Sequence, residues 1–235
     1  MTPQTGAPLR SWSQQFMQRV GYHFVLKALG ITAFMWVFFL AYFHTLRHPV
    51  RPVTEMPLTA LDHWVGFEPL ALLPYVSLWI YVGFAPGLMP SLRQAVVYGL
   101  WAAALCLAGL LAFYAFPTSV PLHPMRVDVS QHAGFALLQG VDAAGNACPS
   151  LHVATAVFTA CWVHRHLLQM GAPAWPKVLN VLWVLLIVWS TLATKQHVAW
   201  DVAAGTLLAL MFVWPSMRWS PGDPPGGVNS GKVAR

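Results

Sequence analysis

The chain has 235 residues, of which 57% are hydrophobic and 9% are charged. Soluble domains carry roughly 25% charged residues, so this composition excludes an ordinary soluble domain and predicts a membrane protein. The formal net charge of +6 is accounted for by the orientation of the chain in the membrane, and we expect no nucleic-acid partner.

The hydropathy pattern predicts an all-α polytopic membrane protein with six transmembrane helices. A bilayer span needs about 20 mainly apolar residues, and the stretches 28–46, 69–92 and 94–125 contain no Lys, Arg, Asp or Glu. We predict one membrane domain over residues 15–218, with mobile cytoplasmic tails at 1–14 and 219–235. The expected spans are 22–45, 69–89, 93–116, 149–168, 177–194 and 198–217.

The basic residues predict the orientation, because cytoplasmic loops carry an excess of Lys and Arg. With six spans, nine of these residues lie at the end that holds both termini and four at the other end, namely Arg47, Arg51, Arg126 and Lys195. We therefore expect cytoplasmic termini, in what we take to be a bacterial inner membrane. The loops 44–68, 117–148 and 193–200 would face the periplasm or exterior.

The stretch STLATKQHVAWDVAAG, residues 190–205, carries the first candidate site. His197 and Asp201 are spaced i,i+4, which places them on one face of a helix. A carboxylate bonded to one imidazole nitrogen makes the other nitrogen a better nucleophile. An ordinary polar pair at a helix start is the alternative, but an unpaired charge opening an apolar helix is costly. The pair therefore indicates a nucleophilic histidine.

The stretch NACPSLHVATAV, residues 146–157, carries the second. Pro149 suits the first turn of a helix, and the N–H groups of Ser150, Leu151 and His152 would then be free to bind an anion. His152 would stand beside that anion and could donate a proton. A helix start with an interfacial histidine is the alternative.

Alternating spans put both stretches on the same membrane face. A phosphate between them would meet His197 on one side and His152 on the other, with Lys195 and Arg126 neutralising its oxygens. An in-line nucleophile, a proton donor and a cationic clamp are what phosphoryl transfer requires. His123 and His132 lie in the same outer loop as Arg126, and their roles stay open.

The two stretches resemble the second and third signature motifs of the type 2 phosphatidic acid phosphatase superfamily. The resemblance implies a six-helix membrane enzyme that uses a phosphohistidine intermediate and no cofactor or metal. His197 would be the nucleophile, Asp201 its orienting carboxylate and His152 the acid, while Ser150 and Ser190 join Lys195 and Arg126 as phosphate-binding residues. Thr191 after Ser190, together with KQH and PSLH, resembles the branch that contains inositol phosphorylceramide synthases.

We therefore predict a membrane lipid phosphatase, with water as the acceptor of the phosphoryl group. A headgroup transferase would use the same residues and a lipid alcohol. A proton-coupled transporter could use His197 and Asp201 as a relay, although the candidates cluster at one membrane face. A zinc hydrolase could bind its metal through His152, His197 and Asp201.

Overall fold

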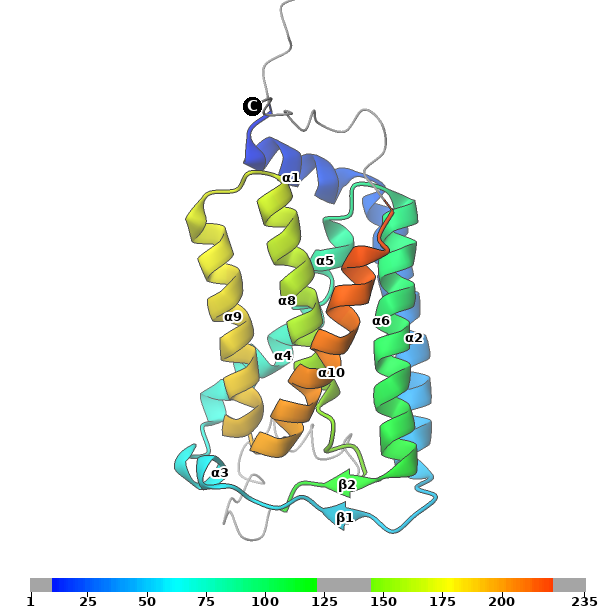
Figure 1. Cartoon of the computed structure of the whole chain (residues 1–235), viewed down its shortest axis with the longest axis vertical. Helices are drawn as coiled ribbons and strands as arrows, with labels where there is room; N and C mark the ends of the chain where they lie inside the picture. The colour runs from blue at the N-terminus through cyan, green and yellow to red at the C-terminus, as the bar shows by residue number, and fades with distance from the viewer. Residues whose placement is uncertain (1–9, 122–144, 222–235) are drawn as a thin grey trace, which may run out of the picture.

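Long helices dominate the residues that the computed structural model describes, 10–121 and 145–221. They run side by side as a bundle, with short elements across both ends (Figure 1). Two short parallel strands, in which Thr54 pairs with Thr118, depart from the predicted all-α fold. The elements are α1 (Trp12–Gly21), α2 (Phe24–Arg47), β1 (Thr54–Glu55), α3 (Ala60–Trp64), the 3₁₀ helix η1 (Pro69–Ala71), α4 (Leu72–Tyr81), α5 (Phe84–Gly87), α6 (Leu92–Ala115), β2 (Thr118–Ser119), α8 (Leu151–Gln169), α9 (Ala174–Ala193) and α10 (Ala199–Arg218).

Within this described part of the chain, five helical segments are long and apolar enough to cross a membrane. They are Phe24–Arg47, Pro69–Gly87, Leu92–Ala115, Ala174–Ala193 and Ala199–Arg218, and they coincide with five of the expected spans. The protein is therefore mainly helical and integral to the membrane. The remaining expected span, 149–168, is helical as α8 but is not among the five.

The position of α8 explains why it is less apolar than its neighbours. It carries three histidines and Arg165, and most of its residues are buried against other helices. It packs most extensively on α10 and α9 and also contacts α6, α5 and α4. Polar side chains within a membrane protein face the bundle interior, so a central helix tolerates residues that a lipid-facing helix excludes.

The expected span 69–89 is not one continuous helix. It is divided into η1, α4 and α5, with a break at Val82 and Gly83. Pro86 follows within α5, and a proline removes a backbone donor and disturbs the preceding turn. The segment nevertheless has the length and hydropathy of a span.

The chain is already helical at Trp12, inside the segment that we predicted to be a mobile tail. Ser11 caps α1, since its Oγ accepts a hydrogen bond from Gln14 N at 3.3 Å and Gln14 Oε1 accepts one from Ser11 N at 3.0 Å. This reciprocal pair is the capping box that an S-x-x-Q sequence favours. The helix lies across the end of the bundle remote from α3 (Figure 1). Residues 1–9 and 222–235 lie outside the described residues.

Two glycines allow close packing around the start of α8. A Cβ on Gly205 of α10 would lie 2.4 Å from Ser150 O, and a Cβ on Gly109 of α6 would lie 2.4 Å from Leu151 Cδ2. Real Cβ atoms do not approach other atoms this closely. Gly205 is therefore required in this packing, because it meets a backbone atom, whereas a Cβ at Gly109 would require the Leu151 side chain to move. The N-terminus of α8 is thereby held between α6 and α10.

Candidate active site

His152 lies in the first turn of α8 and is 8% exposed. Ser150 caps this helix, with its Oγ accepting a hydrogen bond from Val153 N at 3.2 Å. The ring of Tyr75, from α4, stacks on the imidazole at a centroid distance of 4.0 Å and an angle of 14°. Trp79, one turn further along α4, meets the same imidazole edge-on at 6.0 Å. Two aromatic rings therefore restrict the orientation of His152.

His197 lies in the tight turn between α9 and α10. The backbone N–H groups of Gln196 and His197 both donate to Thr191 O at 3.1 Å, and Lys195 adopts a left-handed conformation with φ of 58°. His197 Nδ1 lies 3.5 Å from Asp201 Oδ2. That oxygen also accepts a hydrogen bond from Val198 N at 2.9 Å, so the carboxylate is fixed at the start of α10.

The structure brings the two sequence stretches together. Ser150 N donates to Asp201 O at 3.1 Å, and Gly205 packs directly against Ser150. His152 and His197 both line one cavity. His197 Nδ1 and Asp201 Oδ2, at 3.5 Å, lie within ion-pair distance without forming a hydrogen bond.

Some of the buried polar side-chain atoms without a hydrogen-bond partner, in the part of the chain that the structure describes, lie at this site. In the described ranges, His152 Nε2, His197 Nδ1 and Asp201 Oδ1 are buried and have no hydrogen-bond partner. Leaving such an atom unsatisfied costs about 1–3 kcal/mol, so each one calls for an explanation such as a catalytic role, a bound ion or an ordered water. The three atoms belong to the three residues predicted to be catalytic.

Lys195 is directed away from the cavity. Its Nζ donates to Asp62 O at 2.9 Å and also to Val65 O, both in the segment around α3. Burial lowers the pKa of Lys195 from its ordinary value, while the carboxylate of Asp62 acts in the opposite direction. The structure thus does not bring the Lys195 ammonium to the histidines, and its predicted contact with phosphate stays a prediction.

The other predicted phosphate ligands are placed as follows. Ser190 Oγ is buried within α9 and donates to Ile187 O at 2.6 Å. Arg126, His123 and His132 lie outside the described residues.

The expectation of three free N–H groups at the start of α8 is wrong for Ser150, because its N–H donates to Asp201 O. Pro149 precedes the cap and is not in the first turn of the helix.

Asp62 contributes to the site and was not predicted from the sequence. Its Oδ2 accepts hydrogen bonds from Thr59 N at 2.7 Å and Thr59 Oγ1 at 2.8 Å, while Oδ1 accepts one from Ala199 N at 2.8 Å. One buried carboxylate therefore caps both α3 and α10. The T-x-x-D spacing of Thr59 and Asp62 is a capping signature, but the bond to Ala199 joins positions far apart in the sequence.

A cysteine nucleophile and a metal site are two alternatives to a histidine nucleophile that can be compared with this geometry. Burial and the nearby Asp201 carboxylate raise the pKa of Cys148 to about 11, so its thiol is protonated at neutral pH and is a poor nucleophile. Within the described part of the chain, no group of three or more His, Cys, Asp or Glu residues is arranged to hold a metal ion.

Comparison with known proteins gives one match. A family model described as the PAP2 superfamily matches residues 67–214, more than half of the chain, and this segment includes Tyr75, His152, His197 and Asp201. No curated protein and no solved structure matches the chain.

Proposed function

The chain belongs to the PAP2 superfamily, and we propose that it is a membrane lipid phosphatase that acts through a phosphohistidine at His197. Membership of the family supports a phosphatase, and the apolar helices support a substrate that resides in the membrane. The observation that carries the proposal is the cluster of buried, unpartnered atoms of His152, His197 and Asp201 beside one cavity.

In the first step, His197 Nε2 attacks the phosphorus atom of the substrate phosphate ester. Asp201 Oδ2, 3.5 Å from Nδ1, holds the tautomer that leaves Nε2 free to react, and it stabilises the imidazolium that forms. The bond from phosphorus to the lipid oxygen breaks, and His152 protonates that oxygen as it leaves. The phosphate oxygens face the positive end of α8.

In the second step, a water molecule attacks the phosphohistidine. His152, now neutral, accepts a proton from the water, the bond from phosphorus to nitrogen breaks, and inorganic phosphate is released. With a phosphodiester lipid as donor, His197 would carry the headgroup phosphate after the first step. A lipid alcohol in place of this water would then accept that group, which is the headgroup transfer catalysed by inositol phosphorylceramide synthases. The residues required are the same in both reactions, so the acceptor is assigned by experiment.

Purified protein in detergent with EDTA tests the proposal. We expect phosphate release from a lipid phosphate, such as phosphatidate or a prenyl diphosphate, and we expect His197→Ala to abolish it. His152→Ala should slow turnover most for substrates with poor leaving groups, because these need the proton most. The matched control is His63→Ala, at an exposed histidine in α3, which should retain wild-type activity.

Three other outcomes of this assay would assign a different reaction or mechanism. A lipid that carries the donor's headgroup phosphate, and that forms only when a phosphodiester phospholipid and ceramide or diacylglycerol are both supplied, would assign headgroup transfer. Activity lost in EDTA and restored by zinc would replace the phosphohistidine with metal chemistry. Full activity of His197→Ala would contradict the proposed mechanism.

A further inference from the structure

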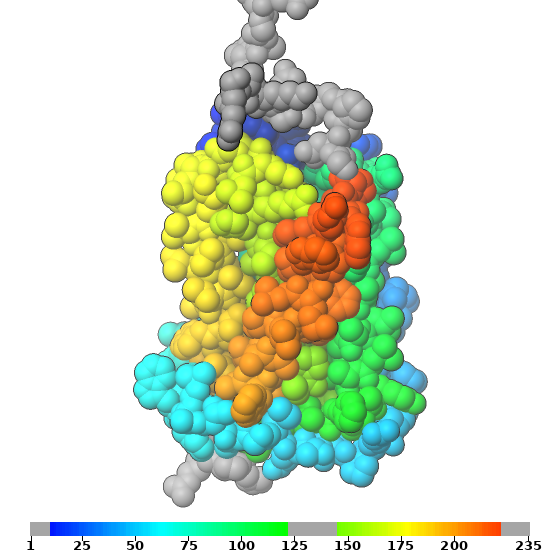
Figure 2. All heavy atoms as spheres, viewed as in Figure 1, coloured from blue at the N-terminus to red at the C-terminus, as the bar shows by residue number. Residues whose placement is uncertain are grey.

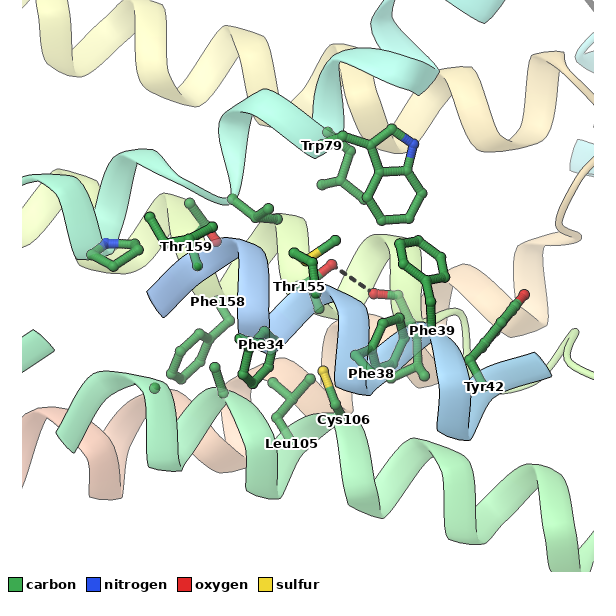
Figure 3. A pocket seen from close by; sticks show the side chains of 18 of the residues that line it. Phe34, Phe38, Phe39, Tyr42, Trp79, Leu105, Cys106, Thr155, Phe158 and Thr159 are labelled. Atoms are coloured by element: carbon green, nitrogen blue, oxygen red, sulfur yellow. Dashed lines mark hydrogen bonds between the residues drawn. The ribbon is translucent and has the colours of Figure 1, made fainter. Parts of the chain in front are cut away.

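A long apolar cavity begins at His152 and His197, two of the three proposed catalytic residues. Its volume is about 570 Å³, and it lies between α2 on one side and α4, α6 and α8 on the other. In Figure 3 the rings of Phe34, Phe38 and Phe39 come from α2, Leu105 and Cys106 come from α6, and Trp79 comes from α4. Ligand sites of this size typically have apolar walls and a few polar groups that fix the orientation of the ligand.

The polar groups of the wall differ between its two ends. His152 and His197 line the cavity at the end near α3, and both belong to the proposed site. Lys27 lines the cavity near the other end, but its Nζ donates to the carbonyls of Arg19, Gly87 and Met89, each at 2.8 Å. An ammonium group has three donors, so Lys27 has no donor left for a ligand. The charged group of a ligand therefore belongs at the histidine end.

The length of the cavity exceeds one leaflet of a bilayer. Its lining residues on α2 run from Leu26 to Phe43, which corresponds to about 25 Å of helix at a rise of about 1.5 Å per residue. The hydrocarbon core of a bilayer is about 30 Å thick, so one leaflet contributes about 15 Å. A chain that starts at the histidines and fills the cavity would pass the midplane of the membrane.

Two glycines border the remote half of the cavity. Gly30 of α2 and Gly99 of α6 line the cavity, and a Cβ at either position would meet no atom within 4 Å. They differ in this respect from Gly109 and Gly205, which allow two helices to touch. A glycine in a helix interior is less favourable than alanine, and here helix packing does not require it.

We propose that this cavity binds a hydrocarbon chain of the lipid phosphate, and that the enzyme acts on lipids whose chain is longer than one leaflet. The inference rests on the proposed function, since the phosphate is placed at His152 and His197. It goes further by assigning a chain-binding site, one wall of which, α2, lies outside the matched residues 67–214.

The first test locates the bound hydrocarbon chain directly. Eicosyl phosphate and octyl phosphate, each with a diazirine on the terminal carbon, are photolysed with the His197→Ala protein, which should not consume them. We expect the eicosyl probe to label residues near Gly30, Phe34 and Gly99, with the labelling suppressed by unmodified eicosyl phosphate. Labelling confined to lipid-facing residues such as Leu100, or labelling that eicosyl phosphate does not suppress, would show that bulk lipid occupies the cavity and would overturn the inference.

The second test compares matched variants. Gly99→Phe should lower the ratio of kcat/KM for eicosyl phosphate to that for octyl phosphate by roughly tenfold, the loss expected when a few methylene groups leave an apolar site. Leu100→Phe, at a neighbouring residue that is 65% exposed and does not line the cavity, should leave the ratio unchanged. An unchanged ratio in Gly99→Phe would contradict the inference even if hydrolysis is confirmed. Suppressible labelling near Gly99 without any hydrolysis would instead contradict the proposed function alone.

Discussion

In the proposed mechanism, the chemistry of His197 depends on Asp201. Its side chain is fully buried, its Oδ2 accepts the Val198 N–H, and the same oxygen lies 3.5 Å from His197 Nδ1. A buried carboxylate with an unpartnered oxygen is costly. The cost is offset when the neighbouring imidazole becomes cationic, because the two charges then attract in a medium of low dielectric constant.

Asp201→Asn should separate this electrostatic role from a structural one. The amide oxygen can still accept the Val198 N–H, so we expect a thermal midpoint close to that of the wild type. The neutral amide does not stabilise an imidazolium, and we expect kcat to fall on the order of a hundredfold or more. Measurements of kcat and of the thermal midpoint on the same preparation check both expectations, and a fully active variant would contradict the assigned role.

At the scale of elements, the segment from Asp62 to Glu68 supports the turn that carries His197. Lys195 Nζ donates to Asp62 O and to Val65 O. On the other side of the turn, Asp62 Oδ1 accepts a hydrogen bond from Ala199 N. Glu68 N donates to Ala193 O at 3.0 Å. In the space-filling view the cyan part of the chain, which includes this segment, lies at the end of the bundle beside α9 and α10 (Figure 2). From these contacts we infer that Lys195 positions the turn that carries His197.

Lys195→Met decides between positioning and direct contact with phosphate. If Lys195 positions the turn, the variant should have a lower thermal midpoint and a lower kcat, while inhibition by inorganic phosphate stays within about twofold of the wild type, a change in binding of about 0.4 kcal/mol. If Lys195 binds phosphate, the inhibition constant should rise by roughly tenfold, which corresponds to about 1.4 kcal/mol. The second result would contradict the role inferred from the structure.

The contact between α8 and α10 aligns the two halves of the site. A Cβ on Gly205 would lie 2.4 Å from Ser150 O, which is a backbone atom that cannot move independently of α8. We expect Gly205→Ala to cost about 1–3 kcal/mol of stability and to lower kcat by separating His152 from His197. Gly87→Ala is the control, since a Cβ there meets nothing within 4 Å. Equal thermal midpoints and activities for the two variants would show that this contact does not align the site.

Much of the helical framework could be predicted from the sequence, because each lipid-facing helix must satisfy its own backbone within an apolar run. The family and the pairing of the histidine stretches could also be predicted from local motifs. The stacking of Tyr75 on His152, the direction of Lys195 and the double capping by Asp62 could not. Each depends on residues far apart in the sequence, for which hydropathy and local spacing carry no signal.

At the scale of the whole molecule, the site lies at the end of the bundle opposite α1 (Figure 1). The start of α8 and the turn between α9 and α10 are both at the site end, while α10 finishes at the opposite end. The excess of Lys and Arg at the opposite end favours a cytoplasmic location for it. We therefore expect the site to face the periplasm or exterior.

Single cysteines test this orientation in a variant in which Cys106, Cys148 and Cys161 are replaced by alanine. Trp64, at the site end, is 83% exposed, and Trp175, at the start of α9, is 60% exposed. In intact cells, a membrane-impermeant maleimide should label Trp64→Cys and should label Trp175→Cys only after lysis. The reverse pattern would place the site on the cytoplasmic face.

The most direct test of the account is to trap the covalent intermediate. The protein is mixed with a lipid phosphate that carries a radiolabelled phosphoryl group, the reaction is quenched in base, in which phosphohistidine survives, and the labelled peptide is identified by mass spectrometry. We expect a phosphoryl group on His197 in the wild type and in His152→Ala, and none in His197→Ala. Hydrolysis of the lipid with no labelled protein, or a label that persists in His197→Ala, would contradict the proposed mechanism.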